Sequence, residues 1–132
     1  MIKKQFTLYL ENKPGALAKI TSLLAMEKIN LEGISVSAST DVGLVQIVPG
    51  DSESAKKVLM KANVPFTVQD VALLPLQDKP GSLAEAASAL AKAGININYV
   101  YATTCDCEGE CNCNVVISAP NLAKVESVWK KL

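Results

Sequence analysis

The first half of the chain shows two hydrophobic periods in turn. Residues 5–10 place apolar side chains at every second position, which is typical of a strand with one buried face. After a Lys-Pro-Gly break, apolar residues recur every three to four positions, which indicates a helix. Two more alternating stretches follow, and then a helix that Asp51 or Ser52 can cap. The expected elements are strands at 5–10, 33–38, 44–48 and from 64 onward, with helices at 14–28 and 52–62.

The same pattern returns in the second half of the chain. Residues 13–30 and 79–96 share ten identities over 18 positions without a gap, at an offset of 66 residues. Five extra residues separate the second and third expected strands of this copy, and we expect no final strand after its last helix. The second copy predicts strands at 72–76, 95–104 and 115–117, and helices at 80–93, ended by Gly94, and 122–129.

The order strand–helix–strand–strand–helix–strand is the ferredoxin-like, or split βαβ, arrangement. We therefore expect an α+β protein of two ferredoxin-like βαββαβ units in tandem, with antiparallel sheets and helices on one face. The expected units are 1–69 and 70–132, and the second carries a cysteine-rich hairpin insertion at 105–113 and lacks its last strand. This lack would leave strand 71–76 with an open edge. Either a long shared strand over 66–76 joins the sheets, or a partner chain covers the edge. We expect the protein to form a homodimer.

Both copies carry a motif that resembles the ACT domain. Segment 12–20 reads Asn-Lys-Pro-Gly-Ala-Leu-Ala-Lys-Ile and is followed by Ile-Asn-Leu. Segment 78–84 reads Asp-Lys-Pro-Gly-Ser-Leu-Ala and is followed, at 94–97, by Gly-Ile-Asn-Ile. The resemblance covers nearly the whole chain, twice. It implies a small-molecule regulatory module, most often for amino acids, with ligands near the loop before the first helix and at interfaces between paired domains.

The chemistry of these loops fits such a ligand. The first N–H groups of a helix have no internal partner, and the helix dipole favours negative charge there. Gly15 and Gly81 would let a ligand carboxylate approach the backbone closely. The alternative is that the Lys-Pro-Gly segments are only structural turns.

The resemblance also implies which residues contact the ligand. In the ACT family, asparagines at the positions of Asn12 and Asn30 contact the bound amino acid. Asp78 stands at the first of these positions in the second copy, so we expect a weaker or different site there. The candidate ligand-binding residues are Asn12, Pro14, Gly15, Ala16, Asn30 and Leu31 in the first copy and Asp78, Gly81, Ser82, Asn96 and Ile97 in the second.

Four cysteines gather in the insertion. Cys105, Cys107, Cys111 and Cys113 are arranged symmetrically about Gly109. If a hairpin folds there, the four thiols converge as zinc or Cu(I) would require. Two cross-strand disulfides, or free thiols on an exposed acidic loop, are the alternatives. The alternative function is thus a metal-binding or thiol-redox protein; no cofactor is expected to be required apart from zinc or copper at this cluster.

Composition narrows the classes of function further. The chain has no histidine, and its 13 basic residues, all lysine, balance 13 acidic residues to a net charge of zero. Imidazole-based catalysis is therefore excluded, and we expect no enzyme, no nucleic-acid partner and no membrane partner. No apolar run suits a membrane span or a secretory signal, which favours the cytoplasm. We expect a non-catalytic amino-acid sensor, with a regulated enzyme in trans as its partner.

Overall fold

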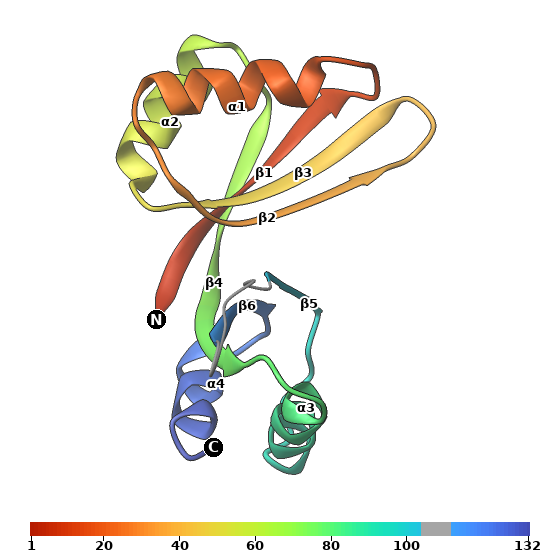
Figure 1. Cartoon of the computed structure of the whole chain (residues 1–132), viewed down its shortest axis with the longest axis vertical. Coiled ribbons are helices and arrows are strands. Elements are labelled where there is room, and N and C mark those ends of the chain that lie inside the picture. Colours follow the sequence, from red (N-terminus) through yellow and green to blue (C-terminus); the bar gives the residue numbers. More distant parts are fainter. Residues whose placement is uncertain (104–111) are drawn as a thin grey trace. The chain divides into compact units, whose positions relative to one another are not determined.

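The structure is a computed structural model of the whole chain, and it describes residues 1–103 and 112–132 (Figure 1). Backbone contacts divide the chain into two compact units. We call residues 4–69 the N-terminal unit, and residues 70–132 together with 1–3 the C-terminal unit. Within the described residues, no helix is long and apolar enough to cross a membrane.

The N-terminal unit contains one complete copy of the repeat. Its sheet has the order β2-β3-β1-β4 and is antiparallel between β1 and β3 and between β2 and β3. Helices α1 and α2 cover one face of this sheet (Figure 1). Asp51 caps α2, as expected, by accepting a hydrogen bond from the backbone N–H of Ser54 at 3.1 Å. The elements are β1 (Ile2–Glu11), α1 (Ala16–Met26), β2 (Leu31–Ala38), β3 (Val42–Pro49), α2 (Ser52–Lys61) and the first part of β4 (Phe66–Gln77).

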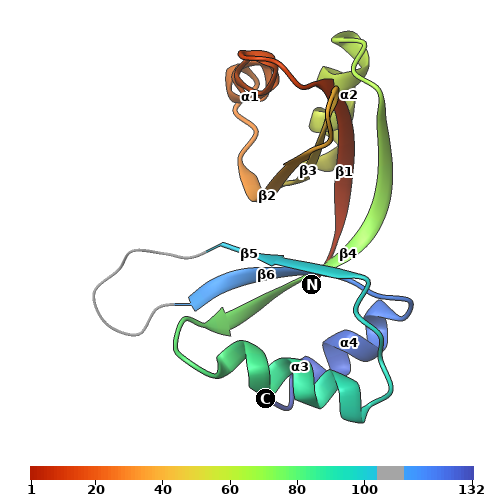
Figure 2. The same ribbon diagram turned by 90° about the vertical axis from the view of Figure 1, so that its right-hand side faces the viewer.

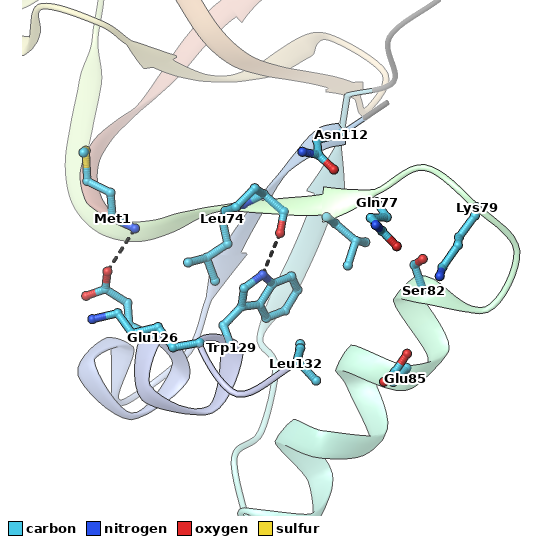
Figure 3. A pocket seen from close by; sticks show the side chains of 13 residues that line it. Met1, Leu74, Gln77, Lys79, Ser82, Glu85, Asn112, Glu126, Trp129 and Leu132 are labelled. Atoms are coloured by element: carbon cyan, nitrogen blue, oxygen red, sulfur yellow. Dashed lines mark hydrogen bonds and ion pairs between the residues drawn. The ribbon is translucent and has the colours of Figure 1, made fainter. Parts of the chain in front are cut away.

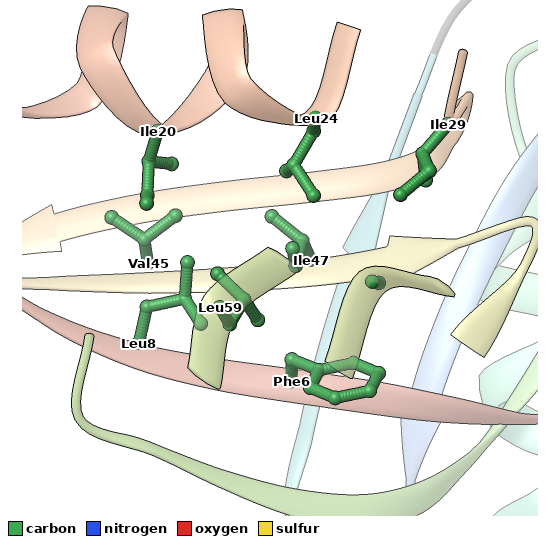
Figure 4. Packing of buried hydrophobic residues seen from close by; sticks show 9 residues of the cluster. Phe6, Leu8, Ile20, Leu24, Ile29, Val45, Ile47 and Leu59 are labelled. Atoms are coloured by element: carbon green, nitrogen blue, oxygen red, sulfur yellow. The ribbon is translucent and has the colours of Figure 1, made fainter. Parts of the chain in front are cut away.

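The core of this unit lies between the helices and the sheet (Figure 4). Side chains from the alternating positions of β1 meet the helical stripe of α1, as the two periods predict. The rings of Phe6 and Phe66 pack against each other, with centroids 5.5 Å apart. The fully or nearly buried members are Phe6, Leu8, Ile20, Leu24, Ile29, Val45, Ile47, Ala55 and Leu59.

The C-terminal unit repeats this arrangement with fewer strands. Its remaining elements are α3 (Ser82–Lys92), β5 (Tyr99–Ala102), β6 (Asn112–Ser118) and α4 (Leu122–Trp129). Strand β6 pairs antiparallel with both β4 and β5, and Figure 2 shows α3 and α4 on one face of these strands. The buried core residues are Ala72, Leu74, Ala86, Leu90, Cys113, Val115, Ile117, Val125 and Trp129.

The edge of β4 in the C-terminal unit is covered by the chain itself. The backbone N–H of Leu73 donates to the carbonyl of Met1 at 2.8 Å, and the amino group of Met1 donates to the carbonyl of Leu73 at 3.0 Å. Two positions further on, Pro75 has no N–H to satisfy, and its carbonyl accepts a 2.7 Å hydrogen bond from Trp129 Nε1. The β4 edge therefore needs no partner chain at these positions, and β4 is the long strand that the sequence allowed.

The fold class is confirmed, and the largest departure from the expected elements is the start of one strand. The second strand of the second copy was expected over 95–104, but β5 covers only Tyr99–Ala102. Gly94 ends α3 with a φ of 74°, and the following segment bends, with the Asn96 amide donating to Asn98 Oδ1 at 3.4 Å. The partly buried isoleucines at 95 and 97 pack on the core from this loop, so their alternation imitates a strand.

Replacing Trp129 by Phe tests how much the β4 edge depends on the indole hydrogen bond. The change keeps an aromatic ring but leaves the Pro75 carbonyl without its donor. We expect the free energy of unfolding to fall by about 1 kcal/mol, measured by urea denaturation. Tyr9→Phe, which removes an exposed hydroxyl on β1, is the control and should leave the midpoint unchanged. Equal midpoints for Trp129→Phe and the wild type would contradict this role.

Candidate functional site

The Lys-Pro-Gly turns of the two copies have the same backbone geometry. Gly15 and Gly81 occupy the N-cap positions of α1 and α3, with φ angles of 87° and 90°. In each turn, the N–H of the residue after the glycine donates to the carbonyl three positions back, at 3.4 Å in the first copy and 3.3 Å in the second. Positive φ favours glycine, because a Cβ would strain this conformation. The glycine is thus required by the backbone, whatever else the turn does.

Neither helix receives a side-chain cap at this end. The first backbone N–H groups of α1 and α3 therefore point out of the helix without a side-chain acceptor. Such N–H groups and the positive end of the helix dipole together attract a carboxylate or phosphate. Both turns thus have the backbone of an anion site, and the side chains around them decide which one is available.

The lysines of the two turns differ in their electrostatic partners. Lys13 forms an ion pair with Glu11, with 2.9 Å between Nζ and Oε2. The hydrogen bond from Lys13, and then its positive charge, lower the pKa of the Glu11 carboxyl below its usual value. The second copy has the neutral Gln77 in place of Glu11, and Lys79 has no ion pair within the described part of the chain. The positive charge at the second turn is therefore not neutralised by the preceding strand.

Asn12 is held by the neighbouring hairpin. Its amide donates to the carbonyls of Ser39 at 3.2 Å and Thr40 at 3.4 Å, in the turn between β2 and β3. Its backbone N–H also donates to the carbonyl of Asp41, at 2.9 Å. Asp78, the matching residue of the second copy, is exposed. The side chain at this position thus has a structural role in the first copy, whereas the residues of the second copy that match its acceptors lie outside the described residues.

The remaining candidate residues divide between the two ends of the first helix of each unit. Asn12, Pro14, Gly15 and Ala16 precede or open α1, whereas Asn30 and Leu31 follow it. An eleven-residue helix spans about 16 Å, so within one unit these two groups do not meet. The same holds in the C-terminal unit, where Asp78, Gly81 and Ser82 lie before α3 and Asn96 and Ile97 lie beyond it.

A cavity of about 550 Å³ lies in the C-terminal unit, next to the start of α3 (Figure 3). It is bounded by the end of β4, by the first turns of α3 and by the end of α4. Ser82, the first residue of α3, lines it; this residue is 7 % exposed, and its Oγ is buried without a hydrogen-bond partner. Lining residues that the sequence reasoning missed are Leu74, Gln77, Lys79, Glu85 and Trp129.

A smaller cavity, of about 250 Å³, lies on the other side of the same helix start. Asp78, Lys79 and Ser82 line it together with Leu83 and Val100 of the edge strand β5. Two cavities therefore meet at Ser82. A comparison of the two copies could have indicated this cavity, because the copies differ at the residues around it. Ser82 replaces Ala16, Glu85 replaces Lys19 and Gln77 replaces Glu11.

The cysteine cluster lies mostly outside the described residues. This applies to Cys105, Cys107 and Cys111, so the metal hypothesis remains a prediction. Cys113 lies on β6, is 7 % exposed and belongs to the core of the C-terminal unit. Within residues 1–103 and 112–132, no three Cys, Asp or Glu side chains are grouped so as to hold a metal ion.

Comparison with known proteins defines the class of this chain. The family model of the ACT domain pair matches residues 1–123, so the chain belongs to the ACT domain pair family. ACT domain pairs are regulatory modules. The resemblance seen in the duplicated turn is therefore confirmed. Among curated proteins, none matches the chain in sequence.

Solved structures share the fold over nearly the whole chain. Protein BT0572 from Bacteroides thetaiotaomicron is 31% identical, with a TM-score of 0.88 over 99% of this chain and 88% of that one. The ligand-free regulatory subunit of aspartate kinase from Thermus thermophilus is 19% identical, with a TM-score of 0.72 over 99% and 94%. The regulatory subunit of aspartate kinase from Thermus flavus is 17% identical, with a TM-score of 0.64 over 99% and 94%. At these low identities, the two kinase subunits show the shared fold alone.

Glycine-to-alanine substitutions test the backbone requirement of the two turns. Gly15→Ala and Gly81→Ala should each lower the free energy of unfolding by about 1–2 kcal/mol, because alanine is strained at positive φ. Space is not the cause, since a Cβ at either glycine would meet nothing within 4 Å. Gly43→Ala is the matched control, where a Cβ would make an ordinary 3.7 Å contact with the Leu10 carbonyl oxygen. Urea denaturation measures all three; an equal loss for Gly43→Ala would argue against a conformational cause.

Asn12→Ala separates the structural role of this side chain from ligand binding. Losing its two hydrogen bonds to the hairpin should lower the free energy of unfolding by about 1 kcal/mol without any ligand. The matching change Asp78→Ala should have a smaller effect, since within residues 1–103 and 112–132 no hydrogen bond or ion pair holds that side chain. Chemical denaturation of the ligand-free protein compares them. An unchanged stability for Asn12→Ala would show that the hairpin does not depend on it.

Proposed function

We propose that this chain is a non-catalytic sensor that binds a free amino acid or a similar small metabolite and passes the binding event to a regulated enzyme in trans. The observation that carries this proposal is the start of α3, which has no side-chain cap. There the first-turn N–H groups after that of Ser82, the Lys79 charge and the unpartnered Ser82 hydroxyl adjoin a cavity. An α-carboxylate satisfies all three groups at once. The regulatory role of the ACT domain pair supports the same conclusion.

The chemistry of the chain supports binding over catalysis. Imidazole is absent from the sequence, so a general base near neutral pH would need another side chain with a strongly shifted pKa. The charged side chains that line the cavity can hold a ligand that carries charges of both signs.

We also propose that the protein acts as a homodimer. The edge strand β2 carries Ile34 and Val36, which are 39% and 51% exposed, and the edge strand β5 carries Val100, which is 39% exposed. Unpaired strand edges with apolar side chains favour pairing with another chain. Light scattering at micromolar concentration should give a mass near 28 kDa, twice the 14.0 kDa of one chain. A mass near 14.0 kDa would contradict the dimer.

A thermal-shift screen of the twenty amino acids tests the proposed function. A ligand at about 100 times its dissociation constant should stabilise the folded protein by roughly 2.7 kcal/mol, because only the folded state binds it. Zinc and Cu(I) form separate arms and test the metal alternative at the cysteines. If no amino acid raises the melting temperature while a metal does, the sensor hypothesis is wrong and the metal alternative gains support.

A further inference from the structure

In the described residues, Ser82 Oγ is the only buried side-chain nitrogen or oxygen atom that lacks a hydrogen-bond partner. A hydroxyl left in this state costs free energy, so a native fold normally satisfies it or replaces it by alanine. The first copy has Ala16 at the matching position, which shows that the turn itself does not need a hydroxyl. Figure 3 shows the Ser82 side chain beside Gln77 and Lys79, at the end of the cavity formed by β4 and α3. The missing partner is therefore best supplied from the cavity.

The charges around this cavity are of both signs and lie at separate places. Lys79 precedes the helix. Glu85 follows Ser82 by three positions, which places Ser82 and Glu85 on one face of α3. Neither Lys79 nor Glu85 has an ion pair in the described residues. Across the cavity, Glu126 pairs with the amino group of Met1 at 2.9 Å, while Lys130 has no ion-pair partner in the described residues. Within the described residues, Lys79 and Glu85 are thus left without an ion pair beside the unpartnered Ser82 hydroxyl.

One part of the cavity wall, formed by the end of β4 and by Trp129, is apolar. Leu74 and Trp129 are 5% and 8% exposed, and Leu76 is partly buried next to them. Ala72 stands where the first copy has Phe6, so this unit lacks the aromatic pair that Phe66 completes in the N-terminal unit. At about 550 Å³, the space falls within the range of small-molecule sites, about 300–1,000 Å³.

We propose that this cavity binds a free amino acid with a large apolar side chain. The α-carboxylate accepts hydrogen bonds from Ser82 Oγ and from the first-turn N–H groups of α3 that follow the N–H of Ser82, and it faces Lys79. The α-ammonium group faces Glu85, and the side chain packs on Leu74 and Trp129. This inference rests on the proposed function and deepens it, since it assigns the site to the interior of one unit and names the ligand class.

The first copy lacks each of these features. Ala16 has no hydroxyl, Lys19 replaces Glu85, and Glu11 neutralises Lys13. In addition, the partly buried side chains at 64 and 66 pack against the core of the N-terminal unit. The two copies therefore share one backbone turn. Only the second copy places a hydroxyl, a lysine and a carboxylate where they could contact both charges of a free amino acid. This reverses the expectation that the first copy holds the stronger site.

Trp129 provides a local signal for the test, because it is the single tryptophan of the chain and lies in the cavity wall. Titration of the full chain with L-leucine or L-phenylalanine should change its fluorescence and saturate, whereas L-aspartate and L-lysine should bind at least tenfold more weakly. Leucinamide, which lacks the carboxylate, and isocaproate, which lacks the amine, should each bind at least tenfold more weakly than leucine.

Ser82→Ala should weaken leucine binding about tenfold, since it removes a hydrogen bond to a charged group, worth roughly 1.4 kcal/mol. It should leave leucinamide affinity unchanged, and the ligand-free melting temperature should stay the same or rise. Glu85→Gln should weaken leucine binding similarly and leave isocaproate affinity unchanged. The matched controls are Ser88→Ala, an exposed serine on α3, and Glu53→Gln in the first turn of α2, and both should bind as the wild type does.

The outcomes separate this inference from the proposed function. If the thermal screen finds an amino acid that binds but its affinity is the same in Ser82→Ala and Glu85→Gln, the cavity is not the site and the sensor function stands. Preference for a polar amino acid overturns the proposed ligand class. If no amino acid binds in either measurement, the proposed function fails, and this inference fails with it.

Discussion

The strand β4 must find backbone partners along its whole length, and much of the C-terminal unit follows from this constraint. In the N-terminal unit the N–H of Tyr9 donates to the carbonyl of Pro65 at 3.1 Å, so β1 has a strand on each side. The matching residue of the second copy is Pro75, which needs no acceptor, and its carbonyl is satisfied by Trp129. In the second copy, the Trp129 indole and the backbone of Met1 thus provide the hydrogen bonds that a neighbouring strand provides in the first copy. The cavity lies next to this edge, and Leu74, Pro75 and Trp129 line it.

Most of the fold could be predicted from the sequence because local and repeated signals agree. The alternation in β1, the helical stripe of α1 and the cap at Asp51 each predict an element, and the second copy supports the same parse independently. The exception is β5, where alternating isoleucines pack on the core from a loop. Periodicity reports which side chains are buried, and it cannot distinguish a strand from a loop that buries alternate residues. Pairing with β6 decides this, and pairing is a tertiary property.

The candidate site was less predictable because its properties depend on contacts between distant segments. The turn glycines were found, since a positive φ before a helix restricts the residue type. The orientation of Asn12 was not, because the β2–β3 hairpin supplies its acceptors from 27 and 28 residues away. Ser82 was among the candidate residues because of its place in the turn, without any sign that its hydroxyl would be buried. Its meaning appears only when the surrounding core shows that the hydroxyl is buried and has no partner.

Divergence between the copies explains why one backbone turn can serve two purposes. The N-terminal unit satisfies its own groups: Glu11 pairs with Lys13, the Asn12 amide reaches the hairpin, and Phe66 packs on Phe6. Each of these contacts removes a group that a ligand would otherwise use. Within the part of the chain that the structure describes, the C-terminal unit leaves Lys79 and Ser82 without such partners. An unsatisfied buried hydroxyl typically costs about 1–3 kcal/mol. A fold keeps such a cost where something other than stability requires it. The N-terminal unit thus satisfies its polar groups from within, and this difference is the reason why we place the proposed ligand in the C-terminal unit.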